Sequence, residues 1–374
     1  MKGYSTLANG FITLLVALGL AACGGGGGGG PYGGNGSMIP ASSSSSSSAP
    51  TASSFMMTAL VSDGGVSAPH ADTHMKNTWG VAFNPNGFVW VTNADSDTST
   101  LYDGNGVPQT LVVNVPGNPV GIVFNGGGGF TVKKGVLSGS SAFIFAGEGG
   151  TISGWSPGVD ATNAITAYDG SASSASYRGL ALASKGGANF LYAADFHNGR
   201  IDVFDTNFAR TTTTGGFADA TLPAGYAPFG LQAIGGKLYV TFAKVDTATG
   251  DEITGAGLGI LDVFDTDGKL LQRLVTGGAL NAPWGIAMAP ANFGSFSNDI
   301  LVSNFGDGKI NAYNPTSGAM VGTLSQANGS PIVIDGLWGI AFGNDRNNQP
   351  SNTLFFAAGP NDEANGEYGR IDLR

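Results

Sequence analysis

The stretch Asn77-Thr-Trp-Gly-Val-Ala-Phe83 decides the fold, because the chain repeats it. Two near-copies follow far downstream, Trp284-Gly-Ile-Ala-Met288 and Trp338-Gly-Ile-Ala-Phe342. Three weaker copies lie in between: Val120-Gly-Ile-Val-Phe124, Arg178-Gly-Leu-Ala-Leu182 and Phe229-Gly-Leu-Gln-Ala233. The shared glycines stand at 80, 121, 179, 230, 285 and 339, in steps of 41 to 58 residues. A repeat of roughly 40–50 residues made of short strands is typical of a β-propeller. The sequence therefore predicts an all-β, six-bladed β-propeller with four-stranded antiparallel blades.

The two ends of the repeat region predict how the ring closes. The sixth repeat stops at Arg374, one strand short, and Met56–Val61 is a spare apolar strand ahead of the first repeat. We expect this N-terminal strand to complete the sixth blade as its outermost strand, because closure removes the edges of an open array. A β-sandwich or a solenoid is the competing architecture. A solenoid would need polar end caps and would not explain a missing strand matched by a spare one.

The first 54 residues predict an export signal and a tether. Lys2 precedes the apolar run Phe11–Leu20, which is too short to span a bilayer and suits a signal peptide. The run ends in Leu20-Ala-Ala-Cys23, which resembles the lipobox of bacterial lipoproteins and contains the single cysteine of the chain. A free cysteine in a leader is the alternative. We expect a signal peptide at 1–22, a lipidated Cys23 with a disordered Gly/Ser-rich tether at 23–54, and the propeller at 55–374.

The resemblance to lipoproteins also implies a cellular location. A lipid anchor would place the protein in the bacterial cell envelope, and Gly24 rather than Asp after the cysteine favours the outer membrane.

The composition argues against nucleic acid as a partner. The net charge is −10, only 11% of residues are charged, and no cluster of Lys and Arg is large enough to track phosphates.

The repeats resemble those of NHL-type six-bladed propellers. Ala282-Pro-Trp-Gly-Ile-Ala287 and Gly199-Arg-Ile-Asp-Val-Phe204 carry this likeness. More narrowly, Asn77-Thr-Trp-Gly-Val-Ala82 and Ser99-Thr-Leu-Tyr-Asp-Gly-Asn-Gly106 resemble an uncharacterised family of conserved hypothetical bacterial proteins from PEP-CTERM-containing genomes. That family has no established activity, so the resemblance implies the fold and supplies no chemistry.

Polar residues end the second strand of each repeat and form the first candidate site. In an antiparallel meander, the end of strand two and the start of strand one share a face of the ring. These polar residues should therefore form an axial rim, as metal ligands or ligand contacts, together with five candidate face anchors. The rim candidates are Asn93, Asp95, Glu148, Asp195, His197, Lys244, Asn304, Asp307, Asn361 and Asp362. The anchor candidates are Trp79, Arg178, Phe229, Trp284 and Trp338.

Two functions remain open for this rim. The first is a binding or scaffold module for an envelope protein or a glycan, with the aromatic residues as anchors. The second is a metal-dependent hydrolase of lactones or esters, with a divalent cation such as Ca²⁺ held by the rim oxygens. Asx residues also end strands simply because they form turns, so each single position has a structural alternative. Close carboxylates would need a cation or an interleaved Lys244 or Arg178 to balance them.

Other motifs provide weaker evidence of a functional site. His70-Ala-Asp-Thr-His74 has two histidines four residues apart, but in a loop rather than on a helix, so a solvated loop is the better interpretation. The chain has no Gly-x-Ser-x-Gly elbow and no P-loop.

Overall fold

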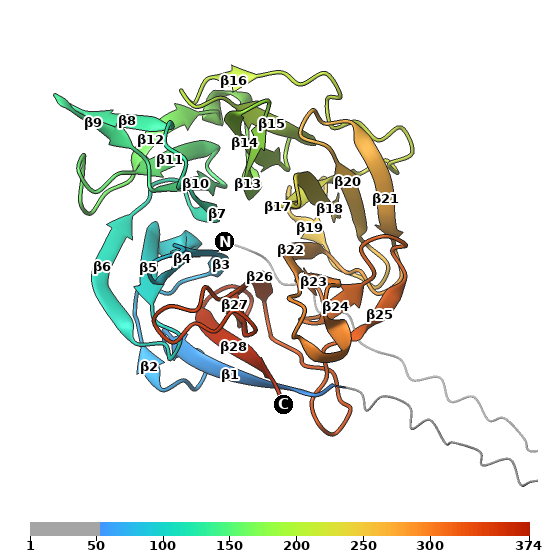
Figure 1. Ribbon diagram of the computed structural model, residues 1–374. Helices are drawn as coiled ribbons and strands as arrows, with labels where there is room; N and C mark the ends of the chain where they lie inside the picture. The colour runs from blue at the N-terminus through green and yellow to red at the C-terminus, as the bar shows by residue number, and fades with distance from the viewer. Residues whose placement is uncertain (1–52) are drawn as a thin grey trace, which may run out of the picture. The chain divides into compact units, whose positions relative to one another are not determined.

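The computed structural model describes residues 53–374 and shows a ring of six blades around one axis (Figure 1). Each blade is an antiparallel sheet whose first strand is innermost, which confirms the predicted fold class. The first blade consists of β3 (Thr78–Phe83), β4 (Val89–Asn93), β5 (Thr98–Tyr102) and β6 (Pro108–Asn114). The second consists of β7 (Pro119–Phe124), β10 (Phe143–Gly147), β11 (Thr151–Trp155) and β12 (Ile165–Asp169). The third consists of β13 (Tyr177–Lys185), β14 (Ala188–Asp195), β15 (Arg200–Phe204) and β16 (Arg210–Thr211).

The last three blades follow the same plan. The fourth blade consists of β17 (Tyr226–Ile234), β18 (Lys237–Val245), β20 (Ile260–Phe264) and β21 (Leu270–Thr276). The fifth consists of β22 (Pro283–Met288), β23 (Ile300–Asn304), β24 (Ile310–Tyr313) and β25 (Met320–Thr323). The sixth combines β26 (Leu337–Phe342), β27 (Leu354–Ala358) and β28 (Glu367–Leu373) with β1 (Phe55–Ser62) and β2 (His70–Ala71). Two additions lie outside the repeat: β19 (Glu252–Ile253) pairs with β18, and β8 (Thr131–Lys134) with β9 (Leu137–Ser140) forms a separate hairpin.

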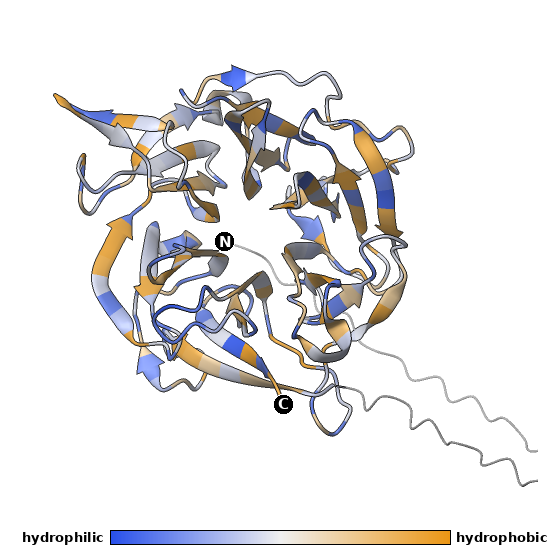
Figure 2. Ribbon diagram, viewed as in Figure 1, coloured by the Kyte–Doolittle hydropathy of each residue, from blue (hydrophilic) through white to orange (hydrophobic). Residues whose placement is uncertain are grey.

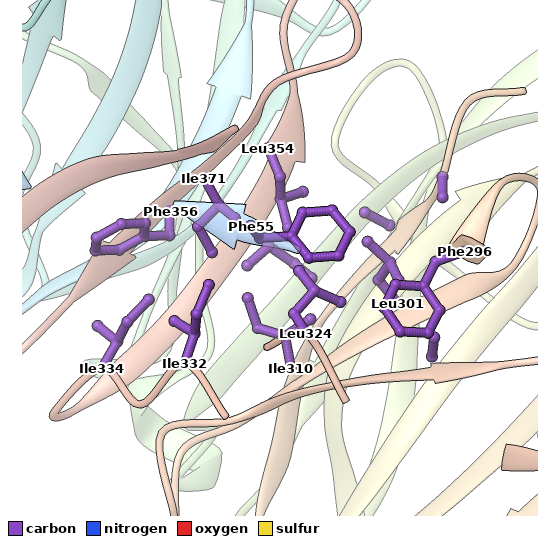
Figure 3. Packing of buried hydrophobic residues seen from close by; sticks show 14 of the residues in the cluster. Phe55, Phe296, Leu301, Ile310, Leu324, Ile332, Ile334, Leu354, Phe356 and Ile371 are labelled. Carbon is purple, nitrogen blue, oxygen red and sulfur yellow. The ribbon is translucent and has the colours of Figure 1, made fainter. Parts of the chain in front are cut away.

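The N-terminal strand closes the ring, as the sequence predicted. β1 pairs antiparallel with β28, with Phe55 opposite Leu373 and Ser62 opposite Glu367. Beyond the prediction, the two-residue strand β2 pairs parallel to β1 and becomes the outermost strand. Phe55 anchors the closure between the fifth and sixth blades, in a core that includes Phe296, Leu301 and Leu354 (Figure 3). Its ring centroid lies 4.9 Å from that of Phe293.

Hydrophobic cores fill the spaces between neighbouring blades. Because successive side chains of a strand point to opposite faces, one strand serves two cores. In β4, Trp90 packs toward the second blade with Phe143, while Val89 and Val91 pack toward the sixth blade with Phe355. The alternation of polar and apolar residues along the blades is visible in Figure 2.

The six repeated glycines allow the first strands to approach one another. A β-carbon on each would meet the neighbouring blade at the residue just before that blade's glycine. The six pairs are Gly80 with Val120, Gly121 with Arg178, Gly179 with Phe229, Gly230 with Trp284, Gly285 with Trp338 and Gly339 with Trp79. Hydroxyls of the second strands link some of these contacts. Ser303 accepts the Gly285 N–H at 2.9 Å and donates to the Trp338 carbonyl at 2.6 Å.

The expectations for residues 1–52, including the signal peptide and the lipidated Cys23, lie outside the described residues. Ser53 and Ser54, expected as the last residues of the tether, bond to the ring: the Ser295 N–H donates to the Ser53 hydroxyl at 2.8 Å, and the Arg374 N–H to the Ser54 carbonyl at 2.9 Å. Within 53–374, no helix has the length and apolar character needed to cross a membrane.

Candidate functional site at the ring axis

One end of the ring axis is closed by aromatic side chains. The strand registers place the start of each first strand beside the end of its second strand, for example Thr78 opposite Asn93. On that face, Trp79, Phe229, Trp284 and Trp338 meet at the axis and form what we call the axial plug. The rings of Trp79 and Trp338 stack with centroids 3.4 Å apart. All four residues are buried, so these predicted face anchors contact one another rather than an open surface.

Arg178, the fifth predicted anchor, is the one charged residue among the six that precede a repeated glycine. It is buried, and its guanidinium carbon lies 5.6 Å from the ring centroid of Trp79 and 5.7 Å from that of Phe196. The guanidinium forms an ion pair with Glu148, and its Nη2 atom lies 3.9 Å from Oδ1 of Asp251. Arg178 is thus the interleaved cation expected for a rim with close carboxylates.

Carboxyl groups from four blades surround this arginine, and we call them the axial acidic cluster. Burial lowers the pKa of Arg178, whereas the negative charges of Glu252, Asp251 and Glu363 raise it. The negative charge of Asp95 in turn raises the pKa of Glu363. The cluster therefore comprises Asp95, Glu148, Asp251, Glu252 and Glu363, from blades one, two, four and six. Four of these carboxyl groups pair with Arg178 or act on its charge, and the fifth, Asp95, acts on Glu363.

Two members of the cluster have raised pKa values. Burial, reinforced by the charge of Glu252, raises the pKa of Glu363 to about 7, although Arg178 opposes the shift. Burial likewise raises the pKa of Glu252, again against Arg178. Oε1 of Glu363 and Nε of Arg178 are both buried and have no hydrogen-bond partner within residues 53–374. The cluster thus stores protons near neutral pH and keeps unused hydrogen-bonding atoms.

Three of the predicted rim residues are engaged inside their own blades. Asn93 is buried and donates to the hydroxyls of Thr98 and Thr100, each at 3.1 Å. Asp195 accepts the amide of Asn198 at 2.8 Å and the guanidinium of Arg200 at 3.0 Å.

Asn304 has a comparable role in the fifth blade. Its amide donates to the Ala279 carbonyl at 2.7 Å, and its Oδ1 accepts the Asn281 N–H at 3.1 Å. These three positions fix loops, as the turn alternative expects.

The remaining rim candidates divide into two groups. Asp95 and Glu148 belong to the axial acidic cluster. The others are not among the groups that pair with Arg178 or shift its pKa within residues 53–374. Asp307 pairs with Lys309 at 3.1 Å, Lys244 is half-buried in β18, and His197, Asn361 and Asp362 are exposed. His74 bonds Asp72 at 2.8 Å.

Sequence reasoning missed Asp251, Glu252 and Glu363. Glu363 lies two residues beyond the predicted Asn361, and Glu252 lies in the long hydrophilic stretch 244–256. The signal that could have found them is the presence of acidic residues in the loops between second and third strands of different blades. No three His, Cys, Asp or Glu side chains in the described part of the chain are grouped so that they could hold a metal ion.

The other end of the axis is open. A cavity of about 470 Å³ lies there, lined by the ends of the six first strands. Its lining includes the third residue after each repeated glycine: Phe83, Phe124, Leu182, Ala233, Met288 and Phe342. The axis therefore has one acidic, aromatic-floored end and one apolar end.

Comparisons with known proteins find viral relatives. No protein-family model matches the sequence. The chain is 35% identical over 324 residues to the uncharacterized protein R648 of Acanthamoeba polyphaga mimivirus, which covers 83% of this chain and 78% of that protein. It is 35% identical over 295 residues to uncharacterized protein L690 of the same virus, covering 75% of this chain and 77% of that protein.

Solved structures share the fold at low identity. A protein of unknown function from Bacteroides thetaiotaomicron VPI-5482 has a TM-score of 0.57 at 13% identity, covering 86% of this chain and 76% of that chain. A putative gluconolactonase has a TM-score of 0.51 at 13% identity, covering 87% of this chain and 93% of that chain. At such identities the likeness shows the fold alone.

The viral relatives correct two expectations. The proposed membership in a bacterial, PEP-CTERM-associated family is wrong, because the curated relatives that the chain matches are mimivirus proteins. The expected bacterial outer-membrane address is contradicted by the same finding. Short motifs such as Leu20-Ala-Ala-Cys23 and Asn77-Thr-Trp-Gly were too brief to distinguish a viral family from a bacterial one.

Proposed function

We propose that this chain, which belongs to the family of the mimivirus proteins R648 and L690, is a binding module that receives a positively charged group at the axial acidic cluster. The group is the ammonium or guanidinium of a basic side chain on a partner protein. The observation that carries the proposal is the charge imbalance around Arg178, where the half-buried carboxyl groups of Glu252 and Glu363 add to the Glu148 carboxylate that already pairs with the guanidinium.

The imbalance has a definite cost. Removing a carboxylate from water without a partner is unfavourable, so burial raises the pKa of Glu252 and raises that of Glu363 to about 7. An incoming cation removes that cost, because it pairs with the carboxylates as they release their protons. The unpartnered Oε1 of Glu363 offers an acceptor for its N–H groups.

The aromatic floor supports the same ligand class. Trp79 and Phe196 already hold a guanidinium near their rings, that of Arg178. Both rings are buried, so they favour a cation at this end of the axis through Arg178 rather than by direct contact with a ligand. A metal-dependent hydrolase, the alternative function, is not supported by any grouping of three metal-ligating side chains within 53–374.

The axial plug provides a reporter for the test. Tryptophan fluorescence should change saturably when N-acetyl-arginine amide or N-acetyl-lysine amide is added, because Trp79 lies in the floor of the site. Glu252→Gln with Glu363→Gln should weaken the fitted affinity about tenfold or more. Glu367→Gln is the matched control, because Glu367 is also buried with a pKa raised to about 7, by burial and the charge of Asp335 rather than by the cluster. Equal affinity in all three proteins would contradict the proposal, and a response to glucosamine alone would assign the site to a glycan.

A further inference from the structure

A hairpin projects from the ring at the second blade. β8 (Thr131–Lys134) and β9 (Leu137–Ser140) pair only with each other and extend away from the other strands (Figure 1). Its tip is apolar (Figure 2). Val136 is 100% exposed and Leu137 is 51% exposed, so the tip holds the most exposed large hydrophobic side chain of residues 53–374. Exposed apolar side chains on a projecting tip indicate a contact surface rather than a core.

The charge around this tip is opposite to that of the protein. Lys133 and Lys134 form the one pair of adjacent basic residues in the chain. No Asp or Glu occurs from Asn125 to Gly147, although the whole chain has a net charge of −10. The tip is therefore a small basic and apolar element on an acidic molecule.

The base of the hairpin is firmly attached. Phe130 and Val132 are buried in the core between the second and third blades. The Phe130 N–H donates to the Thr206 carbonyl of the third blade at 2.6 Å, and the Ser141 hydroxyl donates to the Phe130 carbonyl at 2.7 Å. Lys134 reaches Asp160 at 2.5 Å. The ring thus presents the tip in a fixed direction.

We propose that this hairpin docks the protein on an anionic lipid surface. Val136 and Leu137 enter the boundary between headgroups and acyl chains, while Lys133 keeps its ammonium group among the anionic headgroups and Lys134 stays paired with Asp160. Each lysine close to such a surface strengthens binding by about fivefold. This site is independent of the axial acidic cluster.

The composition of the tip favours lipid over protein as the partner. Hot spots between proteins are rich in Trp, Tyr and Arg, and residues 131–140 contain none of these. Repulsion of the acidic body does not prevent docking. Strands of four residues span about 13 Å, which exceeds the Debye length of about 8 Å at physiological salt.

The test is co-sedimentation of the full chain with vesicles of phosphatidylcholine and phosphatidylserine at about 7:3, compared with phosphatidylcholine alone. We expect the parent to bind the anionic vesicles and to be released by salt. Val136→Ser with Leu137→Ser should reduce the bound fraction about tenfold or more, and Lys133→Gln should separately reduce it about fivefold. Val107→Ser with Val333→Ser removes exposed apolar side chains elsewhere on the ring and should bind like the parent.

Each result decides the proposal. All variants should melt like the parent, because the substituted side chains are exposed. Sedimentation of both hairpin variants at the parent's level overturns the proposal, because residues outside the hairpin would then hold the vesicles. A parent that ignores anionic vesicles also overturns it, as does loss of binding in the Val107 and Val333 control. If the hairpin variants instead lose a protein from a pull-down while vesicle binding is absent, the tip is a protein interface.

Discussion

The main-chain carbonyl oxygen of Trp338 lies 2.6 Å from the point that a β-carbon on Gly285 would occupy. The same close approach recurs between all six first strands, so the repeated glycine is what allows the ring to close around its axis. Gly285→Val should therefore leave the protein unfolded or aggregated, and Gly285→Ala should cost about 3 kcal/mol or more of the free energy of unfolding.

Circular dichroism and thermal unfolding measure this effect. Gly158→Ala is the matched control, because a β-carbon there meets no atom within 4 Å and the backbone is not left-handed. Normal folding of Gly285→Val would mean that the glycines do not set the spacing of the blades.

Closure by β1 predicts a second pair of results. Phe55 is buried between the fifth and sixth blades, so Phe55→Ala should destabilise the protein by about 3–5 kcal/mol. Met57 lies in the same strand but is 37% exposed, so Met57→Ala should cost less than about 1 kcal/mol. Equal denaturation midpoints for the two variants would show that the N-terminal strand does not complete the sixth blade.

The repeat predicted the fold because each copy contains the glycine that close packing of the first strands requires. Trp79-Gly80 and its copies mark the six places where strands crowd the axis, and only glycine fits there. The spare strand at Met56–Val61 similarly predicted closure, since β1 does pair with β28. Such features depend on local sequence and recur in every blade.

The axial site was only partly predictable, because it depends on differences between blades. Glu252, in β19, and Glu363 lie in the connections between second and third strands, whose lengths vary, and no periodicity places them beside Arg178. The burial of Trp79 against Trp338 follows from convergence at the axis, which a linear sequence does not show. The hairpin at 131–140 is an insertion in one blade, so the repeat supplied no expectation for its exposed tip.

Raised carboxyl pKa values predict the pH dependence of stability. Burial raises the pKa of Glu367, Glu363 and Asp262 to about 7 in the folded protein. Each folded carboxyl keeps its proton at a pH where the unfolded chain has lost it. The stabilisation is therefore fully present below the ordinary pKa and is lost as the pH rises to about 7.

The melting temperature should accordingly fall between pH 5 and pH 8. Glu367→Gln should flatten that fall, by at most about 3 kcal/mol, because glutamine cannot ionise. Asp345→Asn should leave this window unchanged, since hydrogen bonds from Ser351 lower the pKa of Asp345. A melting temperature that rises from pH 5 to pH 8 would contradict the raised pKa values.

Removal of the central cation should matter most at high pH. Arg178→Met deprives Glu252 and Glu363 of the charge that opposes their raised pKa values. We expect a loss of about 3 kcal/mol at pH 8, above the pKa of about 7 of Glu363, and a smaller loss at pH 5. Arg210→Met, which removes a 42% exposed partner of Asp202, should cost less than about 1 kcal/mol at either pH. An equal loss for Arg178→Met at both pH values would mean that Arg178 acts by packing alone.

Calorimetric titration of the full chain with N-acetyl-arginine amide tests the central claim most directly, when run in two buffers that differ in ionisation enthalpy. A cation that enters the axial acidic cluster must displace a proton from Glu363, whose pKa is about 7. We predict that at pH 6.5–7 the measured heat depends on the buffer, that affinity rises with pH up to about 8, and that Glu252→Gln with Glu363→Gln abolishes both effects. Binding with the same heat in both buffers and no change of affinity with pH would contradict the account.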